Sequence, residues 1–271
     1  MEAYQGFAEV YDEFLDNVPY SRWAERLDGL IRKYGISRPE REVEGPLDSE
    51  RNLLLDLGCG TGTLAELMYG RGYDVMGVDA SEAMLNIAME KKDESGSEIL
   101  YLQQDMRELE LYGTVGTVFC VCDSLNYILE EQELLGVFRL VNNYLFPGGI
   151  FIFDFNTDYK YRELIGDTTI AENREDCSFI WENVYDAEEE MNECDLTVFV
   201  REEGESFRRF EETHFQRGYT ADQMRRLVEQ AGMKVIEIMD AEEGGDVTQE
   251  SGRICIVAGE HGKTAEGDGA I

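Results

Sequence analysis

Residues 52–81 read NLLLDLGCGTGTLAELMYGRGYDVMGVDAS, and this stretch decides the fold. Leu53 to Leu57 is a short, mostly apolar run, which is typical of a strand buried on both faces of a parallel sheet. A glycine-rich turn, a helical pattern and a second apolar run follow, and the last run ends in Asp79. Glycines let the backbone approach a ligand closely. An acid after the second strand can accept the hydroxyl hydrogens of a ribose. The order predicts a doubly wound α/β fold that binds a ribose-containing ligand.

The spacing of the glycines separates two classes of ligand. Dinucleotide-binding proteins use G-x-G-x-x-G, and Thr63 stands where their third glycine belongs. The order here is D-L-G-C-G-T-G over residues 56–62, which closely resembles motif I of the class I, Rossmann-like S-adenosylmethionine (SAM) methyltransferases. The resemblance implies that the loop cradles the amino-acid end of SAM and that Asp79 binds its ribose. Because Thr63 replaces the third glycine, the sequence does not support an NAD-dependent dehydrogenase.

Other segments extend the resemblance. Ser81 is an expected N-cap, and Met84, one turn inside the helix that follows, is a candidate to pack on adenine or simply in the core. The run Q-D-M at residues 104–106 resembles the adenine site of the family, in which the acid accepts from the exocyclic amine. The cofactor-binding residues that the resemblance implies are Tyr20, Arg22, Trp23, Asp56, Gly58, Cys59, Gly60, Asp79, Ala80, Met84, Asp105, Met106, Cys122 and Asp123.

The N-terminal segment carries an aromatic stripe and the pattern V-Y-D-x-F at residues 10–14. This pattern resembles the N-terminal lid of small-molecule N-methyltransferases, the branch that acts on glycine and sugar amines. The resemblance makes Tyr11 a candidate catalytic residue beside the sulfonium, with core packing as the alternative. A helix over 22–34 with Ser21 as its N-cap is expected next. Arg22 is a candidate partner for the SAM carboxylate, and a solvent-exposed arginine is the alternative.

The loop after the strand at 115–121 is expected to face the methyl group, because ligands of open α/β sheets sit outside the carboxyl ends of the strands. It reads Cys122-Asp123-Ser124-Leu125-Asn126-Tyr127, and Asn126 and Tyr127 are candidate acceptor contacts. The loop lacks the [DNS]-P-P-[FYW] of amino-DNA methyltransferases, the Pro-Cys pair of cytosine C5 enzymes and the catalytic histidine of some sugar N-methyltransferases. The acceptor and any general base therefore stay open at this stage.

Residues 157–218 interrupt the core. Their β-favouring runs alternate with acids and predict a small antiparallel sheet over the active site. His214 is a candidate base, with an ordinary strand histidine as the alternative, and Arg217 and Tyr219 are candidate acceptor contacts. The expected fold is a seven-stranded, mostly parallel Rossmann-like sheet with this insertion. The expected division is 1–50 helical lid, 51–156 SAM-binding core, 157–218 inserted subdomain, 219–260 remainder of the core and 261–271 disordered tail.

The composition of the chain limits the kinds of partner that it is expected to bind. The chain has 271 residues and a net charge of −34, which disfavours binding of nucleic acid. Its six cysteines show no C-x-x-C and no zinc-like spacing, and no signal peptide or long apolar stretch is evident. These features predict a cytoplasmic protein with reduced thiols, no membrane partner and a monomeric or homodimeric state.

The sequence therefore favours a SAM-dependent methyltransferase that acts on a small molecule. The absence of an evident His/Asp dyad favours an amine, or a soft or acidic acceptor, because a neutral amine needs little help from a base whereas a hydroxyl usually needs it. The absence of a catechol-type metal cluster favours a reaction without a metal. Two alternatives stay open: methylation of RNA or of a ribosome-associated protein, and a SAM-binding regulator without catalysis.

Overall fold

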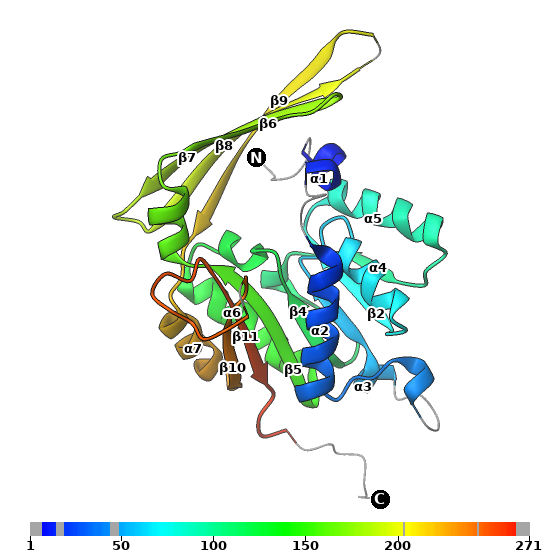
Figure 1. Ribbon diagram of the computed structural model, residues 1–271. Coiled ribbons are helices and arrows are strands. Elements are labelled where there is room, and N and C mark those ends of the chain that lie inside the picture. Colours follow the sequence, from blue (N-terminus) through cyan, green and yellow to red (C-terminus); the bar gives the residue numbers. More distant parts are fainter. Residues whose placement is uncertain (1–6, 15–18, 44–48, 203, 243, 264–271) are drawn as a thin grey trace, which may run out of the picture.

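The computed structural model describes residues 7–14, 19–43, 49–202, 204–242 and 244–263 (Figure 1). The helices are α1 (Ala8–Phe14), α2 (Tyr20–Tyr34), α3 (Ser49–Asn52), α4 (Thr63–Gly70), α5 (Glu82–Ser95), α6 (Glu131–Tyr144) and α7 (Ala221–Gln230). Short helical turns are η1 (Glu40–Glu42), η2 (Met106–Glu108), η3 (Ser124–Tyr127) and η4 (Lys160–Ile165). The strands of the central sheet are β1 (Leu54–Leu57), β2 (Val75–Asp79), β3 (Leu100–Gln103), β4 (Val115–Cys120), β5 (Leu145–Asn156), β10 (Lys234–Asp240) and β11 (Arg253–Gly259). The strands of the inserted sheet are β6 (Thr169–Asn173), β7 (Cys177–Asp186), β8 (Met191–Arg201) and β9 (Phe207–Arg217).

The central sheet has seven strands in the order β10-β11-β5-β4-β1-β2-β3. Strands β1 to β5 pair in parallel, whereas β11 runs antiparallel to both β5 and β10. The predicted mostly parallel, doubly wound sheet is confirmed. Because β11 runs the other way, its first residue, Arg253, pairs with the last residue of β5, Asn156. Arg253 therefore lies at the edge where the parallel strands end.

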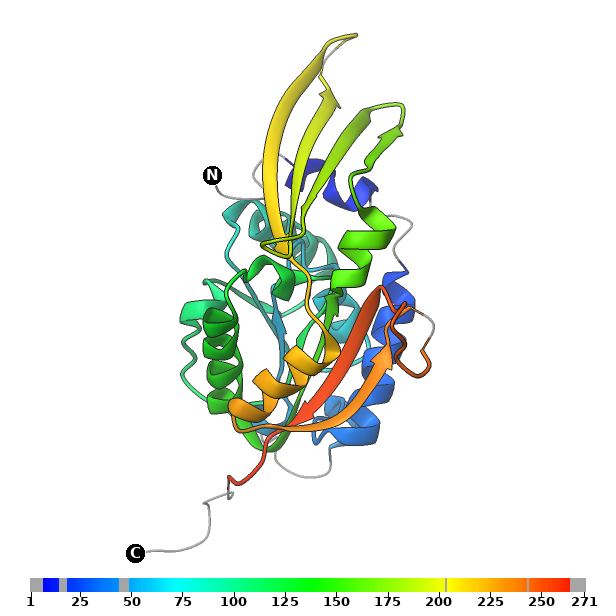
Figure 2. The same cartoon turned by 90° about the vertical axis from the view of Figure 1, so that its left-hand side faces the viewer.

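Helices cover both faces of this sheet (Figures 1 and 2). On one face, α6 and α7 pack over Leu55, Leu57 and three phenylalanines of β5, Phe151, Phe153 and Phe155. On the other face, α2 and α4 pack over Leu54 and the opposite side of β4 and β5. All four residues of β1 are buried, so the apolar run reads as a strand covered on both faces.

Of the two helix caps predicted from the sequence, the one at Ser81 is confirmed. The Ser81 side chain accepts from the Met84 N–H, and Thr220 forms a reciprocal capping box with Gln223. The cap at Ser21 was wrong, because α2 begins at Tyr20 and the carbonyl of Pro19 accepts from the N–H groups of residues 22 and 23. Ser21 therefore lies inside the first turn.

The insertion forms a separate four-stranded antiparallel sheet in the order β6-β7-β8-β9, as predicted, with β6 as a strand that the sequence did not signal. Figures 1 and 2 show this sheet extending from the carboxyl edge of the core, with α1 beneath it. Val10 and Phe14 of α1 pack against Phe179, Leu196 and Val198 on the inner face of the sheet. The N-terminal helix is thus held between the insertion and the core.

Strand β5 contains Pro147, Gly148 and Gly149 at an irregularity, where the pairing shifts from Val115–Leu145 to Thr117–Ile150. Most of the predicted C-terminal tail, residues 264–271, lies outside the described residues. No helix in the described part of the chain is long and apolar enough to cross a membrane.

Gly116 in β4 gives a test of the packing at the amino end of this sheet. A Cβ at this position would lie 1.7 Å from the Arg51 carbonyl oxygen, whereas a Cβ at Gly136 in α6 would meet nothing within 4 Å. We expect Gly116→Ala to lower the free energy of unfolding by at least about 2 kcal/mol, because backbone must move to admit the methyl group. Gly136→Ala is the matched control and is expected to raise it by roughly 0.5–1 kcal/mol. Urea unfolding measures both, and equal stability of the two variants would contradict this account of the packing.

Candidate cofactor and acceptor site

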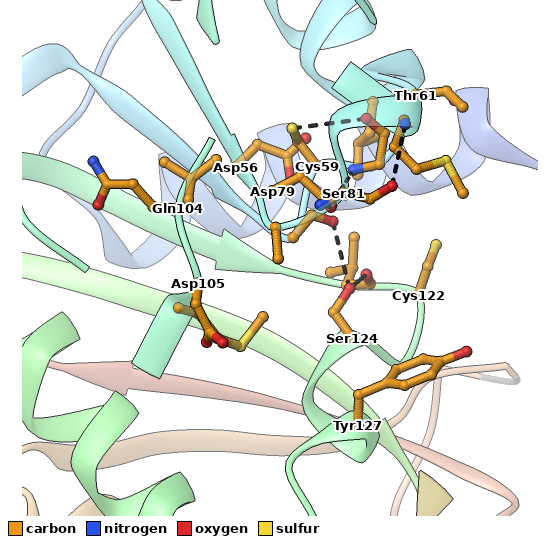
Figure 3. A pocket seen from close by; sticks show the side chains of 18 of the residues that line it. Asp56, Cys59, Thr61, Asp79, Ser81, Gln104, Asp105, Cys122, Ser124 and Tyr127 are labelled. Carbon is orange, nitrogen blue, oxygen red and sulfur yellow. Dashed lines mark hydrogen bonds between the residues drawn. The ribbon is translucent and has the colours of Figure 1, made fainter. Parts of the chain in front are cut away.

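A cavity of about 490 Å³ opens at the carboxyl edge of the central sheet (Figure 3). Its wall includes most of the residues predicted for the site, namely Tyr11, Tyr20, Asp56, Gly58, Cys59, Gly60, Asp79, Ala80, Met84, Asp105, Met106, Cys122 and Tyr127. The wall also includes residues that the sequence analysis did not assign to the site, among them Thr61, Thr63, Ser81, Gln104, Arg107 and Ser124. These added residues are direct or near neighbours of predicted ones, so their signal was the motif itself.

The glycine loop between β1 and α4 forms one wall of the cavity. Gly58 has φ = 80°, and a Cβ there would lie 2.7 Å from the Ser124 hydroxyl oxygen. Gly60 has φ = 53°, and a Cβ there would meet nothing within 4 Å. The first glycine is therefore required by contact with the loop after β4, and the second keeps the wall open to a ligand.

Asp79 fixes the loop to the end of β2. One carboxylate oxygen accepts from the Gly60 N–H at 2.8 Å and the other from the Ser81 N–H at 2.8 Å. Burial raises the pKa of Asp79, and these backbone donors oppose the rise. Carboxylate oxygens have further lone pairs, so Asp79 can hold the loop and still accept from ribose hydroxyls.

Asp56, at the third position of β1, is the most unusual acid of the cavity. It is 3% exposed, and its Oδ2 atom has no hydrogen-bond partner in the part of the chain that the structure describes. Burial, and then the nearby Asp79, raise its pKa well above the ordinary range. A buried carboxylate of this kind is stabilised when a cation enters the cavity.

Asp105 and Arg107 also line the cavity, and Figure 3 shows Asp105 apart from Tyr127. Asp105 caps η2 by accepting from the Arg107 N–H at 2.9 Å, and it pairs with the guanidinium at 2.6 Å. This pairing lowers the pKa of Asp105, which therefore stays a carboxylate. Its role as acceptor for the adenine amine stays a prediction.

The loop after β4 is strained and held by a buried ion pair. Cys122 and Asp123 have φ values of 63° and 59°, which non-glycine residues rarely adopt. Arg253 donates to the Asp123 carboxylate, and its Nε lies 3.5 Å from Asp154, which also accepts from the Asp123 N–H. Burial and the nearby Asp154 raise the pKa of Cys122, so its side chain is a neutral thiol and not a nucleophile.

The lid helix α1 reaches the glycine loop through Asp12. Its carboxylate lies 2.6 Å from the Lys91 ammonium, and it accepts from the hydroxyl groups of Thr61 and Thr63 at 2.8 and 3.2 Å. This contact places Tyr11 in the cavity wall. Burial, and then the negative groups around it, raise the pKa of Tyr20, which therefore keeps its hydroxyl proton.

Several predicted residues lie outside the cavity wall. Arg22 is exposed on α2, and Trp23 packs in the core with its ring 5.7 Å from the Arg253 guanidinium. Asn126 is fully buried and bonds three backbone groups, of Asn156 (two) and Arg217. Trp23 and Asn126 therefore make structural contacts, and Arg22 is exposed. The roles of all three with ligands stay predictions.

The remaining predicted residues lie in β9 or just after it, and they contact η3 and the loop that follows η3. Arg217 donates to the Leu129 carbonyl at 2.9 Å, and the Tyr219 hydroxyl donates to the Ile128 carbonyl. Asp123 accepts from the Gln216 amide at 2.9 Å behind the cavity wall. His214 also lies behind the wall, with its Nδ1 atom 3.2 Å from the hydroxyl oxygen of Tyr127.

The residues of the cavity fit SAM. The open face at Gly60 leaves room for the ligand, Asp79 offers acceptors to a ribose, and the uncompensated Asp56 offers negative charge to a cationic ligand. SAM carries both a ribose and positive charges, on its sulfonium and on its amino group. Metal independence stays a prediction; within the described ranges, no group of three or more His, Cys, Asp or Glu side chains is arranged to hold a metal ion.

Comparison with known proteins agrees with the geometry. Residues 54–149 match the family model described as a methyltransferase domain. The chain is 34% identical over 233 residues to "Putative methyltransferase YqeM" of Bacillus subtilis, covering 86% of this chain and 87% of that protein. It is similar to the crystal structure of a SAM-dependent methyltransferase from Clostridium acetobutylicum, with a TM-score of 0.81, 26% identity and coverage of 96% of this chain and 100% of the other. CalS10, an amino pentose methyltransferase from Micromonospora echinaspora, shares the fold at a TM-score of 0.69 and 17% identity, over 96% and 98% of the two chains.

The chain belongs to the class I, Rossmann-like SAM-dependent methyltransferases. It is a methyltransferase of class EC 2.1.1.-, and the family implies SAM as the methyl donor and S-adenosylhomocysteine (SAH) as the product. The resemblance drawn from residues 56–62 is confirmed.

Replacing Asp56 is expected to raise the stability of the ligand-free protein and to lower its affinity for SAM. Its pKa in the unfolded chain is near the ordinary value of about 3.9, and burial raises it in the folded protein. The folded state then binds more protons between these two values, so the stability of the ligand-free protein falls as the pH rises through that window. Asp56→Asn removes this loss, and we expect it to raise the free energy of unfolding by about 1–3 kcal/mol at pH 8. The gain is expected to shrink as the pH falls toward 4.

Urea unfolding at pH 5 and pH 8 measures this effect, and calorimetry measures the accompanying loss of SAM affinity. Asp93→Asn is the control, since Asp93 is exposed on α5. A variant of Asp56 that is less stable than the wild type at pH 8 would contradict the assignment of an uncompensated buried charge.

Proposed function

We propose that this methyltransferase transfers the methyl group of SAM to the nitrogen of a small-molecule amine. The observation that carries the proposal is the charge and chemistry of the cavity wall near the end of β4. Tyr11, Tyr20 and Tyr127 line it, and Asp12 and Asp123 lie close enough to Tyr20 to contribute to the rise of its pKa. Neutral hydroxyl groups with carboxylates behind them attract and orient an amine.

SAM supplies a methyl group on a positively charged sulfonium, a carbon already activated for in-line displacement. The protein's own contribution is to hold the two reactants in line and to exclude water, and positioning of this kind can lower a barrier by roughly 7–11 kcal/mol. We infer that Asp79 holds the ribose, that Gly58 to Gly60 follow the amino-acid end, and that Asp56 faces the positive charge. Lid helix α1 then closes the cavity, with Asp12 bound to Lys91.

A small acceptor is also favoured by the size of the site. The cavity of about 490 Å³ is of the size that small-molecule sites have, and α1 contributes Tyr11 to its wall. The net charge of −34 repels a phosphate backbone, which speaks against RNA as the acceptor.

Asp79→Ala is expected to weaken SAM binding at least tenfold, about 1.4 kcal/mol, because the ribose hydroxyls lose their acceptor. Asp79→Asn, which keeps one acceptor oxygen, is expected to lose less. Isothermal calorimetry with SAM, SAH and NADH measures the affinities, and Asp93→Ala is the matched control on α5. We expect binding of SAM and SAH and none of NADH. Unchanged SAM affinity in Asp79→Ala would refute the ribose assignment.

The acceptor class is tested with paired compounds. Each small amine is presented with radiolabelled SAM beside the alcohol of the same carbon skeleton, and methylated product is counted. We expect transfer to amines and none to the matching alcohols, because the nitrogen is the better nucleophile without a strong base. Transfer to the alcohols would contradict the amine proposal. Transfer only to RNA or ribosomes would favour the macromolecular alternative, and SAM binding without any transfer would favour a regulator.

A further inference from the structure

Three side chains form a continuous path from the cavity wall into the inserted sheet. Tyr127 lies in η3 and lines the cavity. Its hydroxyl oxygen lies 3.2 Å from Nδ1 of His214, and the two rings meet edge to face at 5.9 Å. On the far side of the imidazole, Nε2 lies 3.3 Å from Oε2 of Glu212, within ion-pair distance but outside hydrogen-bond geometry. The path therefore runs from the cavity through a phenol and an imidazole to a carboxylate.

The path is buried beyond Tyr127. His214 is 5% exposed and Glu212 is 8% exposed. They point to the same face of β9 because they are two residues apart. A carboxylate beside Nε2 favours the tautomer that carries its proton there, which leaves the lone pair of Nδ1 directed at Tyr127. The Tyr127 hydroxyl can then donate to Nδ1 while its oxygen accepts from a ligand in the cavity.

We propose that Tyr127, His214 and Glu212 form a proton relay that deprotonates the acceptor amine. This inference rests on the proposed function, since it requires an amine in the cavity. The ammonium proton of the acceptor moves to the Tyr127 oxygen while the proton of Tyr127 moves to Nδ1 of His214. The freed lone pair then forms the N–C bond to the methyl group, and the electron pair of the C–S bond stays on sulfur. Glu212 stabilises the imidazolium that results.

The roles in the relay differ. Tyr127 lines the cavity and is the candidate catalytic residue, whereas His214 and Glu212 act through it and are positioning residues. Glu212 is itself held by the lid segment, because its Oε1 accepts from the Phe7 N–H at 3.0 Å. The relay is therefore aligned when the lid segment lies against the inserted sheet.

The tautomer can be measured directly without an acceptor. The chain has two histidines, His214 and the exposed His261, so nitrogen-15 labelling of histidine gives a simple spectrum with an internal control. We expect a proton on Nε2 of His214 and none on Nδ1. Tyr127→Phe is expected to shift the Nδ1 signal, and Glu212→Gln to increase the population with the proton on Nδ1, with His261 unchanged in both. A proton on Nδ1 in the wild type, or an unmoved signal in Tyr127→Phe, overturns the relay.

A second test uses sinefungin, a SAM analogue with a primary amine in place of the S-methyl group. We expect Tyr127→Phe to weaken sinefungin about fivefold relative to SAH, the order expected for one hydrogen bond, with SAH affinity itself unchanged. Tyr112→Phe is the control, because Tyr112 is fully exposed. An unchanged sinefungin-to-SAH ratio with normal SAH binding overturns the relay alone. Loss of SAH binding in the wild type would instead overturn the proposed function.

Discussion

The contact of Arg253 with Asp154 and Asp123 is the interaction on which the arrangement of this site depends. Asp154 is fully buried at the end of β5, and a buried carboxylate needs a partner of opposite charge. The antiparallel direction of β11 supplies one, because it brings the first residue of the last strand to the edge where the parallel strands end. The same guanidinium binds Asp123 and so holds the strained backbone at Cys122 in the cavity wall. The direction of β11 in the sheet therefore determines which charge the two acids meet.

Asp56 lies at the same edge, and within the described ranges no basic side chain opposes the rise of its pKa, whereas Arg253 opposes the rise of the Asp154 pKa. The burial of Asp56 costs stability in the ligand-free protein, and a cation in the cavity would offset that cost. Asp154 is matched by a residue of the fold, whereas Asp56 would be matched by a positively charged ligand.

The sequence predicted those features whose causes are local. The glycine loop, the acid at Asp79 and the cap at Ser81 each depend on residues a few positions apart, and each lies in the cavity wall. The contact of Arg253 with Asp123 joins positions 130 apart, and that of Tyr127 with His214 joins positions 87 apart, so no spacing could reveal them. The cap predicted at Ser21 failed because Pro19 and Ser21, two positions apart, can both start a helix, and the local sequence does not decide between them.

The sequence shows no evident His/Asp dyad, which favours an acceptor that needs no base. In the structure, however, the imidazole of His214 contacts Tyr127 of the cavity wall, and the carboxylate of Glu212 lies beside that imidazole. An alkylamine is mainly protonated near neutral pH, so it gains from a group that removes its proton before attack. The amine proposal therefore rests on the charge of the cavity, and the relay explains how a nucleophilic nitrogen would be generated there. Because α1 binds the glycine loop through Asp12 and the segment before it binds Glu212, one short stretch of chain connects the cofactor end of the cavity to the acceptor end.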